Sequence, residues 1–461
     1  METDYLVIGA GAMGLAFADE LLTRTDAHIT LVDKRHAPGG HWNDAYSFVK
    51  LHQPSVFYGV ESKELTEYRI DDSGPNKGFL SLAEGPEISS YFHTLVRDRF
   101  LPSGRVRFLP LSEVEPEGSV RSLLSGERTS IEVRKRVVDA SYLTNIIPLT
   151  HTRNFTLADG VTCVPPNELP RWCASHARFT VVGAGKTGVD TCCFLLEHGA
   201  APDAIRWIVP RDSWFLNRAT MQPGPEFFIE TFGTFAAGRE ALADATSARD
   251  YALRMEAARG WLRLSRDVEP RMFHGATVSE GELDELRRIR DVVRMGRVRS
   301  IDVDRVRLEA GEVPAARDTL YVDCTASALS RPTPVPIFSG KRITLQMIRY
   351  PYFTYSAALI ALIEATLGSD EEKNRVVTPL HIPDTVEDYL RQQVPDMQNR
   401  VACGRHPVLR EWADNARTDG FTRLMRTVKP TETDKLAVLA RLREASKRAA
   451  QNLPKLLATL D

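Results

Sequence analysis

Two short apolar runs in this chain are each followed at once by a glycine-rich turn. Residues 5–8 read Tyr-Leu-Val-Ile, and residues 179–182 read Phe-Thr-Val-Val. After each turn comes a stretch patterned as a helix, and then a second apolar run, at 29–32 and at 205–209. Short, continuous apolar runs are typical of strands buried in a parallel sheet. Each region therefore predicts a strand–turn–helix–strand unit.

The two turns share the spacing Gly-x-Gly-x-x-Gly, at Gly9, Gly11, Gly14, Gly183, Gly185 and Gly188. In such a turn the first glycine permits a tight bend, the second lets the backbone approach a pyrophosphate, and the third lets helix and strand pack closely. A pyrophosphate then meets the free N–H groups at the positive end of the helix. One copy of this spacing is weak evidence, but two copies in the same context predict a protein that holds two dinucleotides.

The end of each second strand distinguishes the two ligands. Asp33 ends the first of these strands, where a carboxylate accepts hydrogen bonds from ribose hydroxyls and repels a 2′-phosphate. Arg211 follows the second, where a guanidinium favours a 2′-phosphate. The first site is therefore interpreted as an FAD site and the second as an NADPH site. An ordinary exposed arginine is the alternative for Arg211, because the chain has 59 lysines and arginines.

The predicted fold is α/β, with two Rossmann-like dinucleotide-binding domains, a helical insertion and a helical C-terminal extension. We expect residues 1–170 to form the first part of the FAD-binding domain and 316–461 its second part with the C-terminal helices. Residues 171–315 form the expected NADPH-binding domain, which contains a helix-rich insertion at about 212–293. The proline-rich stretch 165–170 marks the crossing between the domains.

Local patterns predict further elements. A helix is expected to open at Ser279, because Glu282 three residues on completes a capping box. The other expected elements are strands at 106–109, 120–123, 130–138, 298–308 and 319–326, the last ending in a turn of small residues, and helices at 88–98, 249–264 and 386–460.

Composition restricts the class of protein. The 461 residues are 43% hydrophobic and 26% charged with a net charge of −2, which is typical of a globular protein without a nucleic-acid surface. The richest apolar run, 357–363, ends at Glu364 and is too short to span a membrane. The first strand begins at Tyr5 and leaves no room for a signal peptide, so we expect a cytoplasmic protein. The composition leaves a homo-oligomer open.

The six cysteines exclude one class of flavoprotein. None of them forms a Cys-x-x-Cys pair or a zinc-ligand pattern, so no metal site is expected. Disulfide reductases with two dinucleotide sites need a redox-active cysteine pair beside the flavin. This chain has no such pair near Gly40.

The order of the motifs resembles that of the class B flavin-dependent monooxygenases, the group of flavin-containing monooxygenases, N-hydroxylases and Baeyer–Villiger enzymes. The resemblance rests on the FAD turn, the sequence Gly39-Gly40-His41-Trp42 and the NADPH turn, and covers residues 1 to about 215 and 322–326. The family fingerprint before the second turn is absent from 163–172, and Ala326 stands where the family has glycine. The chain is thus identified as a divergent FAD/NADP oxidoreductase of this group.

The resemblance also implies which residues bind the cofactors. It places residues 46–55 beside the flavin ring and lets the turn at 323–326 close over FAD. The positions assigned to FAD are Gly9, Gly11, Ala12, Met13, Gly14, Asp33, Lys34, Gly40, His41, Trp42, Gln53, Val114, Asp323 and Thr325. The positions assigned to NADPH are Gly183, Gly185, Lys186, Thr187, Gly188 and Arg211, with Lys186 or Arg218 as a further contact to the 2′-phosphate.

The implied activity is that of an NADPH-using monooxygenase that forms a C4a-(hydro)peroxyflavin from O₂ and oxygenates a small organic substrate at nitrogen, sulfur or a carbonyl. The candidate catalytic residues are Gln53, His52 and Ser55, while a structural histidine is the alternative for His52. Two other functions stay open: an NADPH-dependent flavin reductase or dehydrogenase, and a nucleotide-binding regulator without turnover.

The substrate pocket is expected along the insertion at about 212–293 and the segment 343–348. Neither contains a readable specificity pattern. Four aromatic residues follow closely and form either a pocket wall or part of the core: Tyr350, Tyr352, Phe353 and Tyr355.

Overall fold

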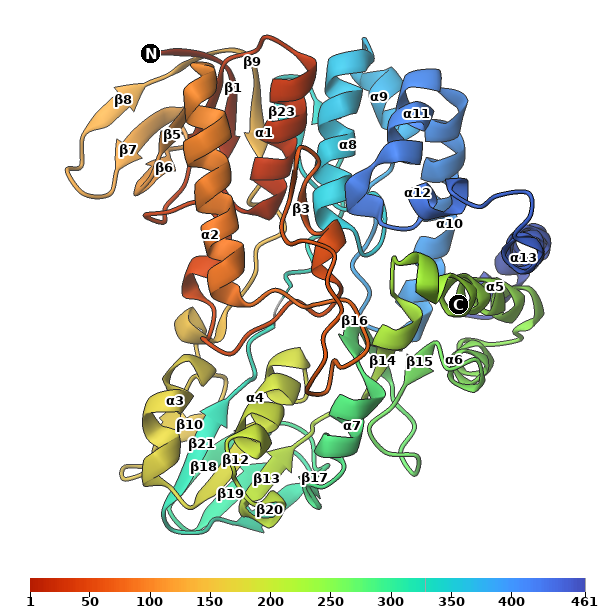
Figure 1. Cartoon of the computed structure of the whole chain (residues 1–461). Helices are drawn as coiled ribbons and strands as arrows, with labels where there is room; N and C mark the ends of the chain where they lie inside the picture. Colours follow the sequence, from red (N-terminus) through yellow and green to blue (C-terminus); the bar gives the residue numbers. More distant parts are fainter. Residues whose placement is uncertain (328, 461) are drawn as a thin grey trace.

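The computed structural model describes residues 1–327 and 329–460, and two sheets form its framework, one parallel throughout and one parallel except for the β22–β23 pair at its edge. The first sheet lies at one end of the molecule and the second at the other (Figure 1). In spatial order the first sheet consists of β22 (Phe338–Ser339), β23 (Arg342–Thr344), β9 (Glu132–Asp139), β1 (Glu2–Ile8), β2 (Ile29–Val32) and β5 (Val106–Leu109). Strands from both ends of the chain therefore build one sheet.

The second sheet is built from the middle of the chain. In spatial order it consists of β11 (Cys163–Val164), β21 (Thr319–Asp323), β12 (Arg178–Val182), β13 (Ile205–Ile208) and β17 (Asp291–Val293), and all neighbours are parallel. Beside it, β10 (Thr156–Leu157) pairs with β18 (Val298–Ile301). Since β10 and β11 already belong with this unit, the crossing lies before Thr156, earlier than the proline-rich stretch expected from the sequence.

The two sheets repeat one topology. The N–H of Gly9 donates to the carbonyl of Val32 at 2.8 Å, and the N–H of Gly183 donates to that of Ile208 at 3.0 Å. β9 lies beside β1 as β21 lies beside β12, and β5 lies beside β2 as β17 lies beside β13. The chain therefore contains two Rossmann-like units, as the glycine-rich turns predict.

Helices cover both sheets. α1 (Ala12–Arg24) packs against α8 (Phe353–Thr366), and α2 (Gly85–Leu95) lies on the same unit (Figure 1). α8 is apolar on all sides because neighbouring elements surround it. In the second unit α3 (Leu169–Trp172), α4 (Lys186–Glu197) and α7 (Glu280–Leu286) lie beside the sheet.

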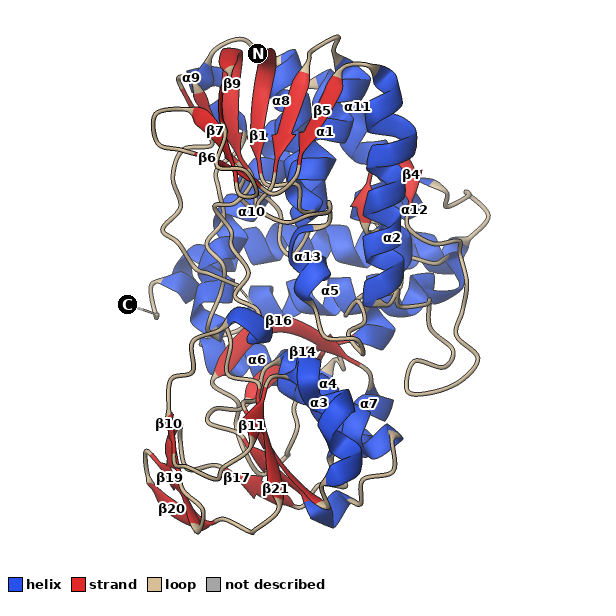
Figure 2. Ribbon diagram, turned by 90° about the vertical axis from the view of Figure 1, so that its left-hand side faces the viewer, coloured by secondary structure: helices blue, strands red, loops and turns tan. Residues whose placement is uncertain are grey.

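A helical layer runs between the two units (Figure 2). Its longest member, α13 (Thr433–Leu457), packs along α5 (Phe228–Asp244). The other helices of the insertion and the C-terminal part are α6 (Ala248–Ala257), α9 (Asp370–Val376), α10 (Val386–Arg405), α11 (Pro407–Asn415) and α12 (Thr422–Arg426). The helical C-terminal part predicted from the sequence is confirmed.

Small antiparallel or mixed sheets complete the fold. They are β3 (Gly59–Val60) with β4 (Lys63–Glu64), β6 (Ser112–Val114) with β7 (Ser119–Ser122) and β8 (Arg128–Ser130), β14 (Ser213–Asn217) with β15 (Trp261–Leu262) and β16 (Met272–Val278), and the extension of β18 by β19 (Arg305–Leu308) and β20 (Gly311–Pro314).

Two sequence predictions need correction. The stretch 298–308 is a hairpin rather than one strand, because the chain reverses between β18 and β19. The helix expected at 249–264 ends at Ala257, because Arg259 has a φ of +56° and the chain then enters β15. Apolar residues occur on both sides of each break, so the hydrophobic pattern does not show where the strand or the helix ends.

Within the part of the chain that the structure describes, no helix is long and apolar enough to cross a membrane. The same residues contain no group of three or more His, Cys, Asp or Glu side chains placed to hold a metal ion.

Candidate functional site

The first glycine-rich turn has the geometry that a dinucleotide requires. Gly9 adopts a φ of +103°, in the left-handed region. A side chain on Gly14 would overlap the carbonyl oxygen of Gly9. α1 then begins at Ala12 and Met13 with Gly11 as its N-cap, and no side chain caps it. Its first N–H groups are therefore available to an anion.

The turn at Gly40 closes against this loop. A Cβ on Gly40 would lie 2.9 Å from the Cα of Gly11, and Gly40 has a φ of +59°. The two glycine backbones therefore touch and leave a cradle without side chains. Next to Gly40, Trp42 donates from Nε1 to the hydroxyl of Tyr58 at 2.9 Å, and Asn145 Nδ2 lies 2.9 Å from His41 Nδ1. Burial, assisted by the charge of Arg35, lowers the pKa of His41 to about 4, so its ring is neutral.

Asp33 points back toward the first turn. Its carboxylate accepts from the N–H of Ala10 at 2.7 Å and from the N–H of Arg35 at 2.8 Å, and the residue is only 6% exposed. Of the neighbouring positions assigned to FAD, Lys34 is exposed and pairs with Glu113 at 3.2 Å, and Val114 ends β6. The structure thus brings Asp33 to the glycine cradle and directs Lys34 to the β6 strand.

The second turn repeats the first. Gly183 has a φ of +118°, and a side chain on Gly188 would overlap the carbonyl oxygen of Gly183. α4 begins at Lys186 and Thr187 with Gly185 as an N-cap that no side chain supplements. A Cβ on Gly185 would have no neighbour within 4 Å, so space lies open above the helix end.

The turn at 323–325 lies against this second loop. A Cβ on Gly183 would come within 2.5 Å of the carbonyl oxygen of Cys324. Asp323 Oδ1 accepts from the N–H of Thr325 at 3.0 Å and from its hydroxyl at 2.6 Å. The resemblance assigns Asp323 and Thr325 to FAD, whereas in the structure their turn lies against Gly183 of the second loop, and their side chains contact Arg153 and His151.

The first loop has its own copy of this turn, which the sequence analysis missed. Asp139 Oδ1 accepts from the N–H of Ser141 at 2.9 Å and from its hydroxyl at 2.7 Å, and Ala140 faces Gly9. A signal was present, because both turns follow a buried valine and read Asp, a small residue, and then Ser or Thr. Ala140 and Ser141 therefore join the candidate site at the first loop.

The positions directly after the second strands of the two units carry different side chains. The N–H of Asp33 donates to Leu109 at 3.1 Å, and the N–H of Val209 donates to Val293 at 2.9 Å. Val209 is therefore the structural counterpart of Asp33. Two residues on, Arg211 is half-exposed and lies 3.8 Å from Asp384. Where the first unit has the carboxylate of Asp33, the second unit thus has the apolar side chain of Val209.

Asp384 gathers three basic side chains at this edge. Besides Arg211, Arg331 approaches the carboxylate at 3.2 Å and His274 Nε2 at 2.9 Å. Burial, together with the charge of Arg331, lowers the pKa of His274. The guanidinium groups of Arg211 and Arg331 therefore share the single carboxylate of Asp384. Arg331 was missed because it lies far from the second turn in sequence.

The segment that contains the predicted catalytic residues is only partly accessible. Ser55 is fully buried; its hydroxyl donates to the carbonyl of Ser81 at 2.9 Å and accepts from the N–H of Ala83 at 2.5 Å. Both bonds stabilise the fold, so the Ser55 hydroxyl is not available for the catalytic role expected from the sequence. His52 and Gln53 are half-buried. Burial and the charges of Lys186 and Arg218 lower the pKa of His52 to about 3, so its imidazole is neutral.

The beginning of the same segment contacts the second unit. Tyr46 donates to Asp190 at 2.7 Å, and the ring of Phe48 stacks on that of Phe194 with centroids 4.2 Å apart. Both partners lie on α4. Tyr46 and Phe48 therefore anchor the segment to α4, whereas the resemblance places them beside the flavin.

A buried network of charges continues from this anchor. It consists of Lys186, Asp190, Arg218 and Glu282, and we call it the Glu282 network. Lys186 pairs with Asp190 and lies 3.5 Å from Glu282 Oε1, while Arg218 Nη1 lies 2.6 Å from Glu282 Oε2. Burial alone would raise the pKa of Glu282, but the charges of Lys186 and Arg218 prevail and lower it to about 2. Lys186 and Arg218 are thus engaged with protein carboxylates, which removes the basis for assigning them to a 2′-phosphate.

Comparison with known proteins adds a family to this geometry. The model of the NAD(P)-binding Rossmann-like domain matches residues 7–60, which contain the first glycine-rich turn. Along 99% of its length, the chain is 41% identical to the uncharacterized proteins Rv2000 of Mycobacterium tuberculosis and Mb2023 of Mycobacterium bovis, and covers 85% of each. The chain belongs to the family of these mycobacterial proteins.

Solved structures of two oxygenases resemble the chain at low identity. Cyclohexanone monooxygenase from Rhodococcus sp. Phi1, bound to NADP⁺, is 13% identical with a TM-score of 0.46, over 97% of this chain and 98% of that one. S-allyl-L-cysteine S-oxygenase from Allium sativum is 13% identical with a TM-score of 0.45, over 97% and 99%.

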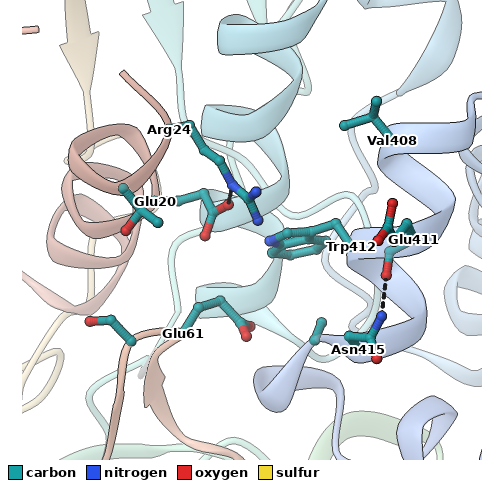
Figure 3. A pocket seen from close by; sticks show the side chains of 10 residues that line it. Glu20, Arg24, Glu61, Val408, Glu411, Trp412 and Asn415 are labelled. Atoms are coloured by element: carbon teal, nitrogen blue, oxygen red, sulfur yellow. Dashed lines mark hydrogen bonds and ion pairs between the residues drawn. The ribbon is translucent and has the colours of Figure 1, made fainter. Parts of the chain in front are cut away.

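A hollow of about 370 Å³ lies between α1 and α11, away from both loops (Figure 3). Trp412 forms one wall, and Glu20, Glu61 and Glu411 supply carboxylates. Glu20 already pairs with Arg24 at 2.7 Å, and Glu61 accepts from the N–H of Arg417 at 2.8 Å. The hollow therefore lies outside the candidate site.

Proposed function

We propose that this protein is a flavin-dependent oxidoreductase that binds FAD at the first loop and NADPH at the second, and that it acts as a monooxygenase. The observation that carries the proposal is the difference between Asp33 and Val209 within two otherwise equivalent loops. A carboxylate suits ribose hydroxyls, and its absence, with arginines nearby, suits a 2′-phosphate.

The first loop fits FAD. The Gly11–Gly40 cradle would receive the pyrophosphate, since neither position carries a side chain and the first N–H groups of α1 are uncapped. Asp33 would hold the ribose, and the Asp139–Ser141 turn stands beside Gly9. His41 and Trp42 directly follow Gly40 of the cradle, and the resemblance adds Gln53 to the same cofactor.

The second loop fits NADPH. Open space above Gly185 and the uncapped start of α4 suit the pyrophosphate. Arg211 and Arg331 would bind the 2′-phosphate. The single carboxylate of Asp384 balances only one of their two positive charges, and the phosphate would balance the other. Thr325 would border the coenzyme from the turn beside Gly183.

When bound, FAD supplies the redox chemistry: it takes electrons from NADPH and passes them to O₂, with one oxygen atom transferred to a small organic substrate. The chain's own part is to align the two cofactors and to exclude water. His52 is neutral, so its ring can accept or donate a hydrogen bond without adding charge. Gln53 offers an amide donor on the same segment.

Cofactor analysis and anaerobic reduction test the proposal. The purified protein should contain one FAD per chain after release and chromatography, and NADPH should bleach its flavin faster than NADH. A protein that carries no flavin, and also binds none when FAD is added, would overturn the proposal. Equal reduction by both coenzymes would overturn the NADPH assignment alone.

A further inference from the structure

The Glu282 network links the second glycine loop to the segment of His52 and Gln53. Building on the proposed function, we propose that Arg218 is a positioning residue: it fixes this segment relative to the NADPH loop, so that hydride passes between correctly aligned cofactors.

Arg218 is bonded to several separate parts of the chain. Its Nε donates to the carbonyl of His52 at 3.1 Å, and its Nη2 donates to the carbonyl of Thr277 at 3.3 Å. Its Nη1 contacts Glu282 at 2.6 Å and Asn76 Oδ1 at 3.5 Å. The residue is 1% exposed, so these contacts are not exchanged with water. A planar guanidinium can hold several partners in fixed directions, which an ammonium cannot.

Glu282 connects this arginine to the glycine loop. Its Oε2 also accepts from the N–H of Ser279 at 2.6 Å, and its own N–H donates to the Ser279 hydroxyl at 3.0 Å, which forms the capping box of α7. Its other oxygen faces Lys186, the first residue of α4. The capping box at the start of α7 therefore fixes the Glu282 carboxylate between Arg218, which holds the His52 carbonyl, and Lys186 of the second loop.

The network is better explained by positioning than by stability alone. Removing one partner of a buried ion pair destabilises a protein, but replacing the whole pair with apolar residues is often neutral. Folding alone therefore does not require four charges at this place. The charges instead fix relative positions. Directional bonds from the network hold the backbone at His52, the side chain of Tyr46 and the start of α4 at Lys186 in one arrangement.

Loss of Arg218 should affect hydride transfer and not coenzyme binding. The coenzyme is held by the second loop and Arg211, so loss of Arg218 should leave its binding intact. The His52–Gln53 segment would lose its backbone donor and shift. Since a displacement of about 1 Å can cost roughly a hundredfold in rate, hydride transfer should slow while affinity stays unchanged.

The chain offers a matched control in Lys373 and Glu364. This pair is equally buried, with side chains 3% and 6% exposed and a distance of 2.6 Å, but it joins α9 to α8. Lys373→Met removes a buried cation as Arg218→Met does, and it leaves the Glu282 network in place. Any effect that the two variants share is a general cost of breaking a buried pair.

The test compares wild type, Arg218→Met, Arg218→Lys and Lys373→Met as flavin-loaded proteins. We expect Kd for NADP⁺ within about twofold of wild type in all of them, and hydride transfer in a single turnover slowed roughly tenfold to a hundredfold in the Arg218 variants only. Arg218→Lys keeps the buried charge but cannot reach His52 and Glu282 together, so it serves if Arg218→Met does not fold. Wild-type rates in the Arg218 variant, or equal slowing in Lys373→Met, would overturn the inference.

A second readout does not depend on turnover. In the protein without coenzyme, amide hydrogen exchange over residues 46–58 should be faster in the Arg218 variant than in Lys373→Met. If wild type neither holds flavin nor oxidises NADPH, the proposed function fails, whereas unchanged exchange in 46–58 contradicts the positioning of this segment by itself.

Discussion

Asp33 and Val209 occupy the same place in two different sheets. Each follows the second strand of its unit, and each N–H donates to the neighbouring strand, at 3.1 Å and 2.9 Å. One position carries a carboxylate that faces its glycine loop, and the other carries a buried methyl-bearing side chain. The two loops are therefore alike in backbone shape and differ in the side chain at the position where the proposed function places the ribose.

Coenzyme preference should depend on Arg211. Arg211→Ala should raise KM for NADPH roughly tenfold to a hundredfold, or about 1.5–3 kcal/mol, because one charged contact to the 2′-phosphate is lost. KM for NADH should barely change. Steady-state kinetics with both coenzymes measure this effect, and Arg259→Ala, which removes an exposed arginine paired with Glu280, is the control. Equal effects on NADPH and NADH would refute the role of Arg211.

Flavin content should depend on Gly11. Gly11→Val places a branched side chain beside Gly40, whose Cα would lie 3.5 Å from its Cβ, and fills the space that the pyrophosphate needs. The variant should purify with little FAD, as measured by visible absorbance per chain. Gly404→Val is the control, because a Cβ there meets nothing within 4 Å. Full flavin content in Gly11→Val would show that the first loop is wrongly assigned.

Substitutions of two glycines in the second loop should affect different properties, coenzyme binding at Gly185 and stability at Gly188. Gly185→Ala should preserve the melting temperature and weaken NADPH binding, because its Cβ points into open space above α4. Gly188→Ala should lower the melting temperature, because its Cβ would overlap the carbonyl oxygen of Gly183. Thermal unfolding and coenzyme titration separate the two effects. Tight NADPH binding by a folded Gly185→Ala protein would contradict the proposed approach of the pyrophosphate.

Acid stability should depend on His52. Its pKa is about 3 in the folded chain, whereas an ordinary histidine titrates near 6.5. Between these values the unfolded chain binds a proton that the folded chain excludes, so stability falls as pH drops from about 6.5 toward 3. His52→Gln should reduce this fall, and His28→Gln, at an exposed histidine, should not. Denaturant unfolding at pH 7 and pH 5 measures the difference; identical pH dependence in wild type and His52→Gln would contradict the lowered pKa.

Much of the fold could be predicted from the sequence, because local rules determine it. Parallel strands, glycine spacing and the Ser279–Glu282 capping box each leave a pattern within a few residues. The Asp-x-Ser/Thr turns at Asp139 and Asp323 also repeat locally, and comparing the two units would have revealed the first of them.

The candidate site was less predictable, because it depends on contacts between distant segments. Ser55 has the polarity of a catalytic residue, yet Ser81 and Ala83 engage its hydroxyl. Lys186 lies in the glycine loop, yet Asp190 and Glu282 neutralise it. Arg331 meets Arg211 only through Asp384. The hydrophobic periodicity of the sequence does not indicate contacts between residues so far apart in the chain.

The most direct test of the monooxygenase assignment follows the oxygen atoms. The flavin-loaded protein would be supplied with NADPH and isotopically labelled O₂, together with a panel of amines, amino acids, sulfides and ketones. The account predicts, for at least one substrate class, a product that carries one labelled oxygen per NADPH consumed, with little hydrogen peroxide. Complete recovery of the electrons as hydrogen peroxide with every class would contradict it, and would identify an NADPH-dependent flavin reductase instead.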